Sequence, residues 1–282
     1  VLMIYSSYQN QPHRKGARMN IKKQIIVFIS VLMVLLIGLL GVRFWYDSKC
    51  VKFQDKNMEI QTLYLLDTGR GRVLKKELDR IEHFYVTNKD GRFTTLEDLK
   101  QFPNLKSVSL DYGVRSMTDE EKEEFQKQRK TIQPMLAETL PDLKDLRELD
   151  LTGFDHFENL DFLSECTQIE ELTIWDSQVE DIRGIQNMEN LRILDLNLNP
   201  FTDISPLQNL KHLEAVNLCW VPVENLEILT RIPSLKLVMY EPASQEEEKI
   251  LQKLERQGVT VYREASDDWW LWKRQREQTL NH

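Results

Sequence analysis

The feature that most constrains the fold is an apolar pattern that returns every 22 residues. The pattern L-x-x-L-x-L, with other apolar residues allowed at each leucine position, begins at residues 169, 191, 213 and 235. A fixed period of this length is the signature of a solenoid, in which each repeat forms one coil. The last two apolar positions are two residues apart, so on a β-strand both side chains point the same way, into the core.

Between the strands, the apolar residues follow a different spacing. From Phe201 to Leu213 they recur every third residue, which suits tight 3₁₀ turns, because side chains at i and i+3 eclipse there. One coil therefore carries a short strand on one side and a narrow return on the other. Neither side can bury its apolar residues alone, so the coils must stack.

The same pattern predicts three earlier strands, beginning at residues 81, 105 and 146. We therefore expect a parallel ribbon of seven strands, with 259–262 as a candidate for one more. The second and third strands start 41 residues apart, which is about nineteen residues more than one repeat. We assign the excess to an insertion at about 113–140, either a tolerated surface loop or a functional one.

These repeats resemble the short leucine-rich repeats of bacterial internalin-like surface proteins, and the strongest single match runs from Leu191 to Asn199 as L-x-x-L-x-L-x-x-N. The resemblance covers roughly residues 51–262. It implies an α/β solenoid with a parallel sheet on its concave face, helical caps at both ends and a binding role. In that family the residue at the Asn199 position hydrogen-bonds the backbone at the corner after the strand. The other coils have Phe154, Ser177 and Val221 there, so we expect no regular asparagine ladder.

An apolar run of eighteen residues, 25–42, is just long enough to span a bilayer. The aromatic residues Phe44, Trp45 and Tyr46 follow it, as expected for the membrane interface. A cleaved signal peptide is the alternative, but no small-x-small cleavage site follows the run. We therefore predict an uncleaved transmembrane anchor over 25–46.

The orientation of this anchor is predicted from flanking charge. Lys22 and Lys23 precede the apolar run, which favours an N-terminus in the cytoplasm and a repeat domain outside it. The sequence Met19-Asn-Ile-Lys-Lys would be a conventional start for such an anchor, so we hypothesise that residues 1–18 are not translated. N-terminal sequencing of the native protein tests this.

The resulting organisation has seven parts. These are a cytoplasmic segment at 1–24, an anchor at 25–46, a linker at 47–56, an N-terminal cap at 57–80, repeats at 81–242, a C-terminal cap at 243–262 and a Trp-rich basic tail at 263–282. The tail carries Trp269, Trp270 and Trp272 beside Lys273. It is expected to form a lid over the last coil or, alternatively, to contact a membrane surface.

Charge and motifs exclude several classes of function. The net charge of −8 divides into +5 over residues 1–42 and −13 over the rest, and an acidic body argues against binding nucleic acid. The three cysteines have no C-x-x-C spacing and suggest neither a disulfide framework nor a zinc site. We find no catalytic motif and predict no enzyme, no cofactor and no metal.

The predicted function is binding of a protein through the strand face, where outward residues of successive coils align. Trp175, Leu198 and Trp220 are expected at one edge of the ribbon, because they have no evident core role. They either form a binding hot spot, where exposed aromatic residues are common, or are covered by the insertion at 113–140 or by the C-terminal tail. The complete candidate surface is Glu148, Asp150, Glu171, Thr173, Trp175, Arg192, Asp195, Asn197, Leu198, Asn217 and Trp220.

Two other functions compete with this interpretation. A surface enzyme acting on glycans would use Glu148, Asp150, Glu171 and Asp195 as acid and base. A deep cleft at these residues would favour it. A repeat domain on the cytoplasmic side would instead be a regulatory scaffold, and membrane topology decides between the two locations.

Overall fold

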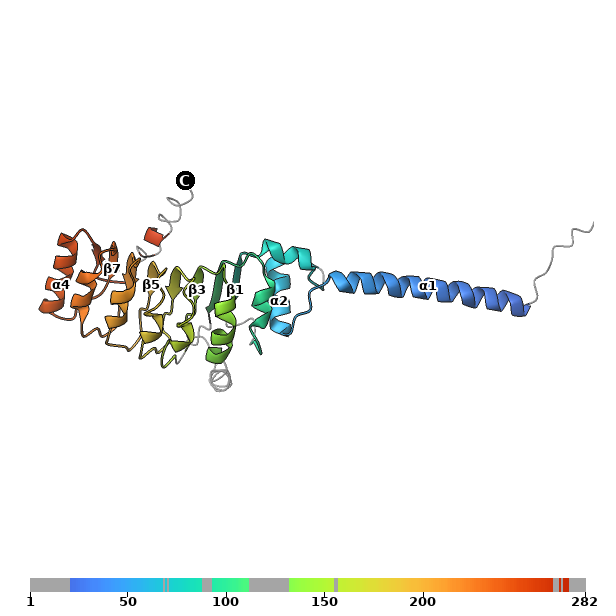
Figure 1. Ribbon diagram of the computed structural model, residues 1–282, viewed down its shortest axis with the longest axis horizontal. Helices are drawn as coiled ribbons and strands as arrows, with labels where there is room; N and C mark the ends of the chain where they lie inside the picture. The colour runs from blue at the N-terminus through green and yellow to red at the C-terminus, as the bar shows by residue number, and fades with distance from the viewer. Residues whose placement is uncertain are drawn as a thin grey trace, which may run out of the picture. The chain divides into compact units, whose positions relative to one another are not determined.

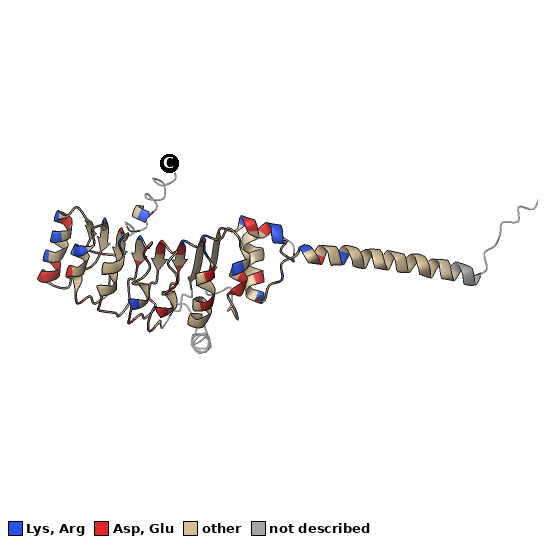
Figure 2. Ribbon diagram, viewed as in Figure 1, with Lys and Arg blue, Asp and Glu red and all other residues tan. Residues whose placement is uncertain are grey.

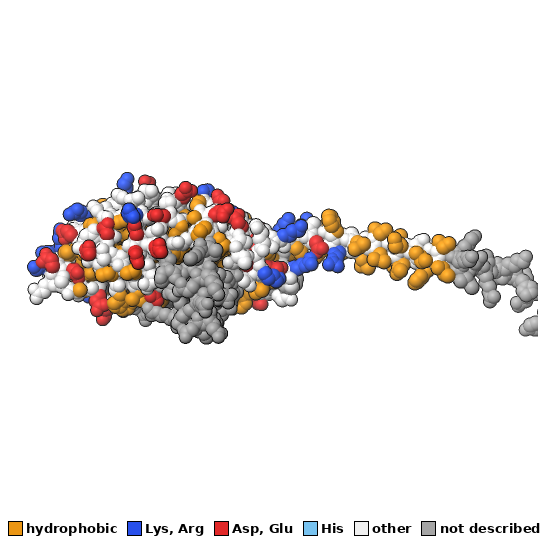
Figure 3. Space-filling view, turned by 90° about the horizontal axis from the view of Figure 1, so that it is seen from below, with side chains coloured by type: hydrophobic (Ala, Val, Ile, Leu, Met, Phe, Trp, Pro, Cys, Tyr) orange, Lys and Arg blue, Asp and Glu red, His pale blue; other side chains and the backbone are white. Residues whose placement is uncertain are grey.

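The computed structural model describes residues 21–67, 69, 71–87, 93–111, 132–154, 157–265, 269 and 271–273. The chain divides into two compact units, Val1–Cys50 and Val51–His282. The first contains helix α1 (Ile21–Lys49). Its stretch Ile25–Lys49 is long and apolar enough to cross a membrane, and its hydrophobic side chains are exposed along the helix (Figure 3). The expected apolar N-terminal helix is therefore present.

The second unit is built on a parallel sheet of eight strands that lie in sequence order (Figure 1). The strands are β1 (His83–Thr87), β2 (Ser107–Asp111), β3 (Glu148–Asp150), β4 (Glu171–Thr173), β5 (Ile193–Asp195), β6 (Ala215–Asn217), β7 (Leu237–Met239) and β8 (Thr260–Tyr262). The predicted repeat solenoid is confirmed. The sheet has eight strands rather than seven, because 260–262 pairs with β7.

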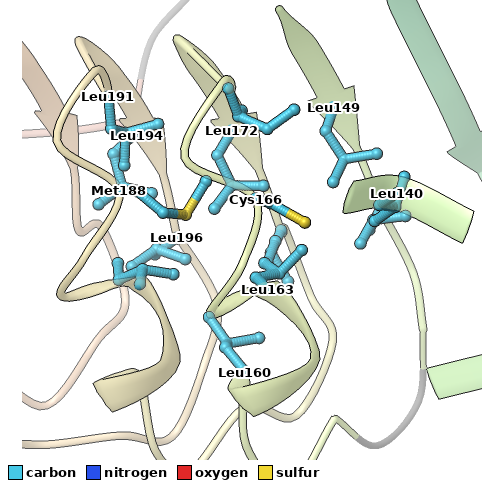
Figure 4. Packing of buried hydrophobic residues seen from close by; sticks show 14 of the residues in the cluster. Leu140, Leu149, Leu160, Leu163, Cys166, Leu172, Met188, Leu191, Leu194 and Leu196 are labelled. Atoms are coloured by element: carbon cyan, nitrogen blue, oxygen red, sulfur yellow. The ribbon is translucent and has the colours of Figure 1, made fainter. Parts of the chain in front are cut away.

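The register places equivalent positions of the repeats side by side. Leu172, Leu194 and Val216 are aligned in consecutive strands, and all three are fully buried. Figure 4 shows Leu149, Leu172 and Leu194 pointing from their strands into the space shared with Leu160 and Leu163 of the return side. The core is thus a continuous column between the sheet and the returns, and no coil closes it alone.

The return side consists of short 3₁₀ helices, as the spacing of three predicts. They are η1 (Lys75–Arg80), η2 (Glu97–Gln101), η4 (Leu140–Asp142), η5 (Asp161–Leu163), η6 (Arg183–Ile185), η7 (Ser205–Asn209) and η8 (Leu226–Arg231). In η6 the coils approach so closely that a Cβ on Gly184 would lie 1.9 Å from the carbonyl oxygen of Leu160. Only glycine fits there.

The Asn199 side chain hydrogen-bonds the backbone at the corner between β5 and its return. Its Nδ2 donates to the carbonyl oxygens of Ile174 and Leu196 at 2.7 and 2.9 Å. Its Oδ1 accepts from the backbone N–H groups of Ser177 and Val179 at 3.2 and 3.0 Å. One side chain therefore satisfies backbone groups of two coils.

The neighbouring corner uses a different residue for the same purpose. Ser177 Oγ lies 3.0 Å from the carbonyl oxygen of Leu151 and 3.2 Å from the backbone nitrogen of Phe154. The equivalent side chains of Phe154 and Val221 are apolar and buried. The repeats thus have no regular asparagine ladder, as expected from the sequence.

The N-terminal end of the solenoid is covered by helix α2 (Lys56–Leu66), which begins at Asp55. The Asp55 carboxylate accepts from two backbone N–H groups of the first turn and from the N–H and hydroxyl of Thr94 in the first coil. Asp98, also buried, accepts from the backbone N–H groups of Gln54 and Asp55. Two buried carboxylates therefore join this helix to the first coil through charge-assisted hydrogen bonds.

The C-terminal end is covered by helix α4 (Gln245–Arg256). Ser244 Oγ accepts from the N–H of Glu247, and the Glu247 side chain accepts from the N–H of Ala243, so two side chains bind backbone N–H groups at the start of the helix. Leu251 and Leu254 are buried on its inner side. Gly258, at φ 91°, then turns the chain into β8.

Residues 113–131 of the predicted insertion lie outside the described residues. The described remainder begins with a helix over 132–139. Ile132, Leu136 and Leu140 are buried in the main core, so this part of the insertion packs against the solenoid.

Candidate binding surface

The outer face of the sheet consists of two rows of side chains set by the register. The first row runs Glu148, Glu171, Ile193, Ala215 and Leu237 from β3 to β7. The second row runs Asp150, Thr173, Asp195, Asn217 and Met239. The first row therefore changes from acidic over β3 and β4 to apolar over β5 to β7, whereas the second row stays polar as far as β6.

In the acidic part, Glu148 and Glu171 are direct neighbours across β3 and β4. Burial and the negative charge of Glu171 raise the pKa of the Glu148 carboxyl, whereas the positive charge of Lys273 opposes that rise. Lys273 Nζ lies 2.7 Å from Glu171 Oε2. The positive charge of Lys273, on the short basic piece near the C-terminus in Figure 2, thus weakens the repulsion between the two carboxylates.

In the apolar part, a second hydrophobic cluster lies outside the main core. It contains Ile193, Ala215, Cys219, Leu237, Met239 and Trp269, with Tyr262 and Trp272 partly buried against it. Trp269 is only 2% exposed. Figure 1 shows the short C-terminal helical piece that carries it. The tail was expected to form a lid over the last coil. Trp269 instead covers the outer face of three strands, β5 to β7.

The middle of the outer face is a hydrogen-bonded polar network. Asp195 accepts from the side-chain amides of Asn197 and Asn217, at 2.7 and 3.1 Å. Asp195 is buried, and burial raises the pKa of its carboxyl to about 6 despite these hydrogen bonds. The carboxylate is therefore held in place and has no open approach to solvent.

Arg192 lies at the other edge of the ribbon from Leu198, because the two residues flank β5 at opposite ends. Its guanidinium forms an ion pair with Glu214, which is also 2.8 Å from Lys236 Nζ. These three residues occupy the same position in successive repeats. Arg192 thus belongs to a row of ion pairs and does not lie beside Leu198 and Trp220 at the other ends of the strands.

A groove of about 850 Å³ follows the ends of β4 to β7. We call it the strand-end groove. It is lined by Asp176, Gln178, Leu198, Asn199, Pro200, Trp220, Val221, Pro222, Val223, Tyr240, Glu241, Pro242, Ala243 and Glu247. Its walls are mainly apolar, and its charged residues are all acidic.

The backbone at these strand ends turns Leu198 and Trp220 outward. Asp176, Leu198 and Trp220 have φ of 52°, 56° and 57°, the left-handed region that non-glycine residues rarely adopt. Trp220 is 53% exposed and Trp175 39% exposed. Trp175 precedes Asp176, so it stands one position nearer the strands than Trp220. Both indoles are therefore accessible.

Four apolar positions of the outer face were not predicted from the sequence: Ile193, Ala215, Leu237 and Met239. A signal was present, because the third residue of L-x-x-L-x-L points outward and is apolar in three consecutive repeats. Fitting Trp269 to those positions requires the three-dimensional path of the C-terminal segment. Trp270 lies outside the described residues.

Metal binding and cysteine chemistry were also considered for the described residues. They contain no group of three or more His, Cys, Asp or Glu side chains placed to hold a metal ion. Burial raises the pKa of the Cys219 thiol to about 12, so this cysteine is protonated and behaves as a small hydrophobic residue.

Comparison with known proteins gives structural matches. No protein-family model matches the sequence, and no curated protein matches it. Internalin C2 of Listeria monocytogenes is 21% identical, with a TM-score of 0.50 over 74% of this chain and 83% of its own. The internalin InlF of the same organism is 19% identical, with a TM-score of 0.41 over 74% of this chain and 68% of its own. Together with the eight-stranded parallel sheet, the match to internalin C2 identifies an internalin-like leucine-rich repeat fold.

Proposed function

We propose that this chain is a non-enzymatic, membrane-anchored protein that displays its repeats outside the cytoplasm and binds a protein partner. The observation that carries the proposal is the strand-end groove, where Trp220 is half exposed beside other apolar side chains and an acidic rim. Large exposed aromatic residues in a concave apolar site are typical of binding hot spots. A deep, enclosed site is not required for this function.

The strand-end groove favours a protein as ligand. Leu198, Trp220 and Pro222 offer apolar surface, and Asp176 and Glu241 offer negative charge. A partner with an apolar side chain next to a basic residue would match both features. Trp175 enlarges the apolar area on the side of the strands.

The anchor supports placement at a membrane. Helix α1 is apolar over Ile25–Lys49, and Lys22 and Lys23 precede the apolar run. Basic residues favour the cytoplasmic side, so the repeats lie outside under this proposal.

The glycan-hydrolysing alternative receives less support. Its carboxylates would be Glu148, Asp150, Glu171 and Asp195, but the strand-end groove is lined by Asp176, Glu241 and Glu247 instead. Asp195 is buried and bound by two asparagine amides, and Glu171 is paired with Lys273. An acid and base acting on a sugar need open access to it.

The binding proposal is tested by the double change Trp175→Ala with Trp220→Ala. Partner capture should be lost while the melting temperature stays near that of the parent protein. Tyr64→Ala is the matched control, because Tyr64 is 69% exposed on α2, far along the sequence from the strand-end groove. Capture retained by the double variant would place the site elsewhere.

The membrane proposal is tested by adding protease to intact cells. The repeat domain should be degraded while a cytoplasmic marker survives. A domain protected until the cells are lysed would instead be the cytoplasm-facing scaffold, and a shortened chain found in the medium would mean a cleaved signal peptide.

A further inference from the structure

The C-terminal segment binds the outer face of the sheet through one side of a short helix. Trp269, Trp272 and Lys273 occupy positions i, i+3 and i+4, which share one face of a helical turn. Trp269 is buried, Trp272 partly buried, and Lys273 pairs with Glu171. Leu271, on the other side, is 49% exposed. The segment thus presents two aromatic rings and one cation to the sheet.

The outer face is complementary to that set of groups. Ile193, Ala215 and Leu237 form an apolar row under Trp269. The same row continues into Glu171 and Glu148, whose adjacent carboxylates favour a cation between them. Along this row the apolar positions are followed by the acidic ones. Along the segment the aromatic residues are followed by the basic one, so the two sequences of groups match.

This contact is separate from the architecture of the repeats. The sheet ends at β8, and the last coil is closed by α4, with its own buried Leu251 and Leu254. Neither Trp269 nor Lys273 belongs to a strand, and among the described residues the last strand ends at Tyr262. The ladders of the eight strands therefore include neither of these two residues.

We propose that the outer face of β4 to β7 is a peptide-binding site for an aromatic and basic segment, and that the turn carrying Trp269, Trp272 and Lys273 is its resident occupant. A partner segment of the same chemistry replaces this occupant. The inference rests on the proposed protein-binding function, and it names the chemistry of the partner. The site is distinct from the strand-end groove, which the tryptophan double variant tests.

The experiment uses the full chain in lipid nanodiscs and a fluorescein-labelled peptide that copies residues 264–282. In Trp269→Ala the resident segment loses its main apolar contact and competes less well for the face. Fluorescence anisotropy should therefore show at least about tenfold tighter peptide binding to Trp269→Ala than to the parent chain. Leu271→Ala is the matched control in the same segment and should bind the peptide as the parent does.

A charge exchange tests the acidic part of the site. Glu171→Lys places a lysine opposite Lys273, so it should also release the resident segment. This variant should prefer a peptide carrying the Lys273→Glu change, whereas Trp269→Ala should prefer the natural peptide. Because the two variants act through different contacts, a folding defect in one, seen as a lost circular dichroism transition, leaves the other informative.

Three results would overturn the inference. A natively folded Trp269→Ala chain that binds the peptide no better than the parent would make the segment a permanent cover. Equal binding to empty nanodiscs would assign the aromatic and basic residues to the membrane surface. If Glu171→Lys and Trp269→Ala prefer the same peptide, Glu171 does not recognise the basic residue. None of these results bears on the strand-end groove. A failure of the protein-binding proposal would appear instead as partner capture that the double change Trp175→Ala with Trp220→Ala leaves intact.

Discussion

The corner residue Asn199 is expected to stabilise two coils at once, so Asn199→Ala should be strongly destabilising. Its side chain is 2% exposed and is the side-chain partner of five backbone groups, those of Ile174, Leu196, Asn197, Ser177 and Val179. The Asn197 carbonyl oxygen also accepts from the N–H of Asp176, so we count the other four. A buried backbone group without a partner costs about 1–3 kcal/mol. Since the alanine leaves room for water at the corner, we take the low end for each group and expect a loss of about 4 kcal/mol.

The assay is urea unfolding of residues 51–282, followed by far-ultraviolet circular dichroism. This part of the chain contains the whole main core, which runs from Val51 to Val259. Asn190→Ala is the matched control. Asn190 is exposed and donates one hydrogen bond, to the carbonyl oxygen of Thr167 at 2.8 Å, so its loss should cost less than about 1 kcal/mol. If the two variants unfold at the same urea concentration, the corner does not join the coils as described.

Three further predictions concern the core and the outer face. Leu194→Ala empties a fully buried position and should cost about 2–5 kcal/mol, measured by the same urea titration. Gly184→Ala should prevent normal packing of η6, because its Cβ would meet the Leu160 carbonyl oxygen, whereas Gly71→Ala, which meets no atom within 4 Å, should melt like the parent. Asp195 binds its proton up to about pH 6 when folded, against 3.8 as the ordinary value. Its ionisation therefore opposes folding: the contribution to stability is greatest below pH 4, falls until about pH 6 and is constant above it. Relative to the parent chain, Asp195→Asn should gain about 3 kcal/mol of stability between pH 4 and pH 7, and a constant difference over that range would contradict the assignment.

Much of the fold could be predicted because every coil repeats the same physical problem. Leu172, Leu194 and Val216 must be buried whatever lies outside the sheet, so their spacing specifies strand, register and return. The corner contact of Asn199 was expected from the resemblance to internalin-like repeats, and its amide has both donors and acceptors for the backbone. The eighth strand was less certain, because it lies beyond α4 and outside the 22-residue period.

The outer face was harder to predict because the period does not restrict it. Arg192 and Ile193 are adjacent and both vary among the repeats, yet Arg192 joins an ion-pair row and Ile193 lies under Trp269. Which outward residues are covered depends on a segment far away in sequence. Local spacing contains no information about that contact.

The central claim, that the repeats bind a protein at the strand-end groove, is tested most directly by site-specific photo-crosslinking in intact cells. A photoreactive residue in place of Trp220 should give a discrete adduct with another protein. The same residue in place of Gln186, which is exposed on the return side of its coil, should give none. An equal adduct from both positions, or none from position 220, would contradict the account.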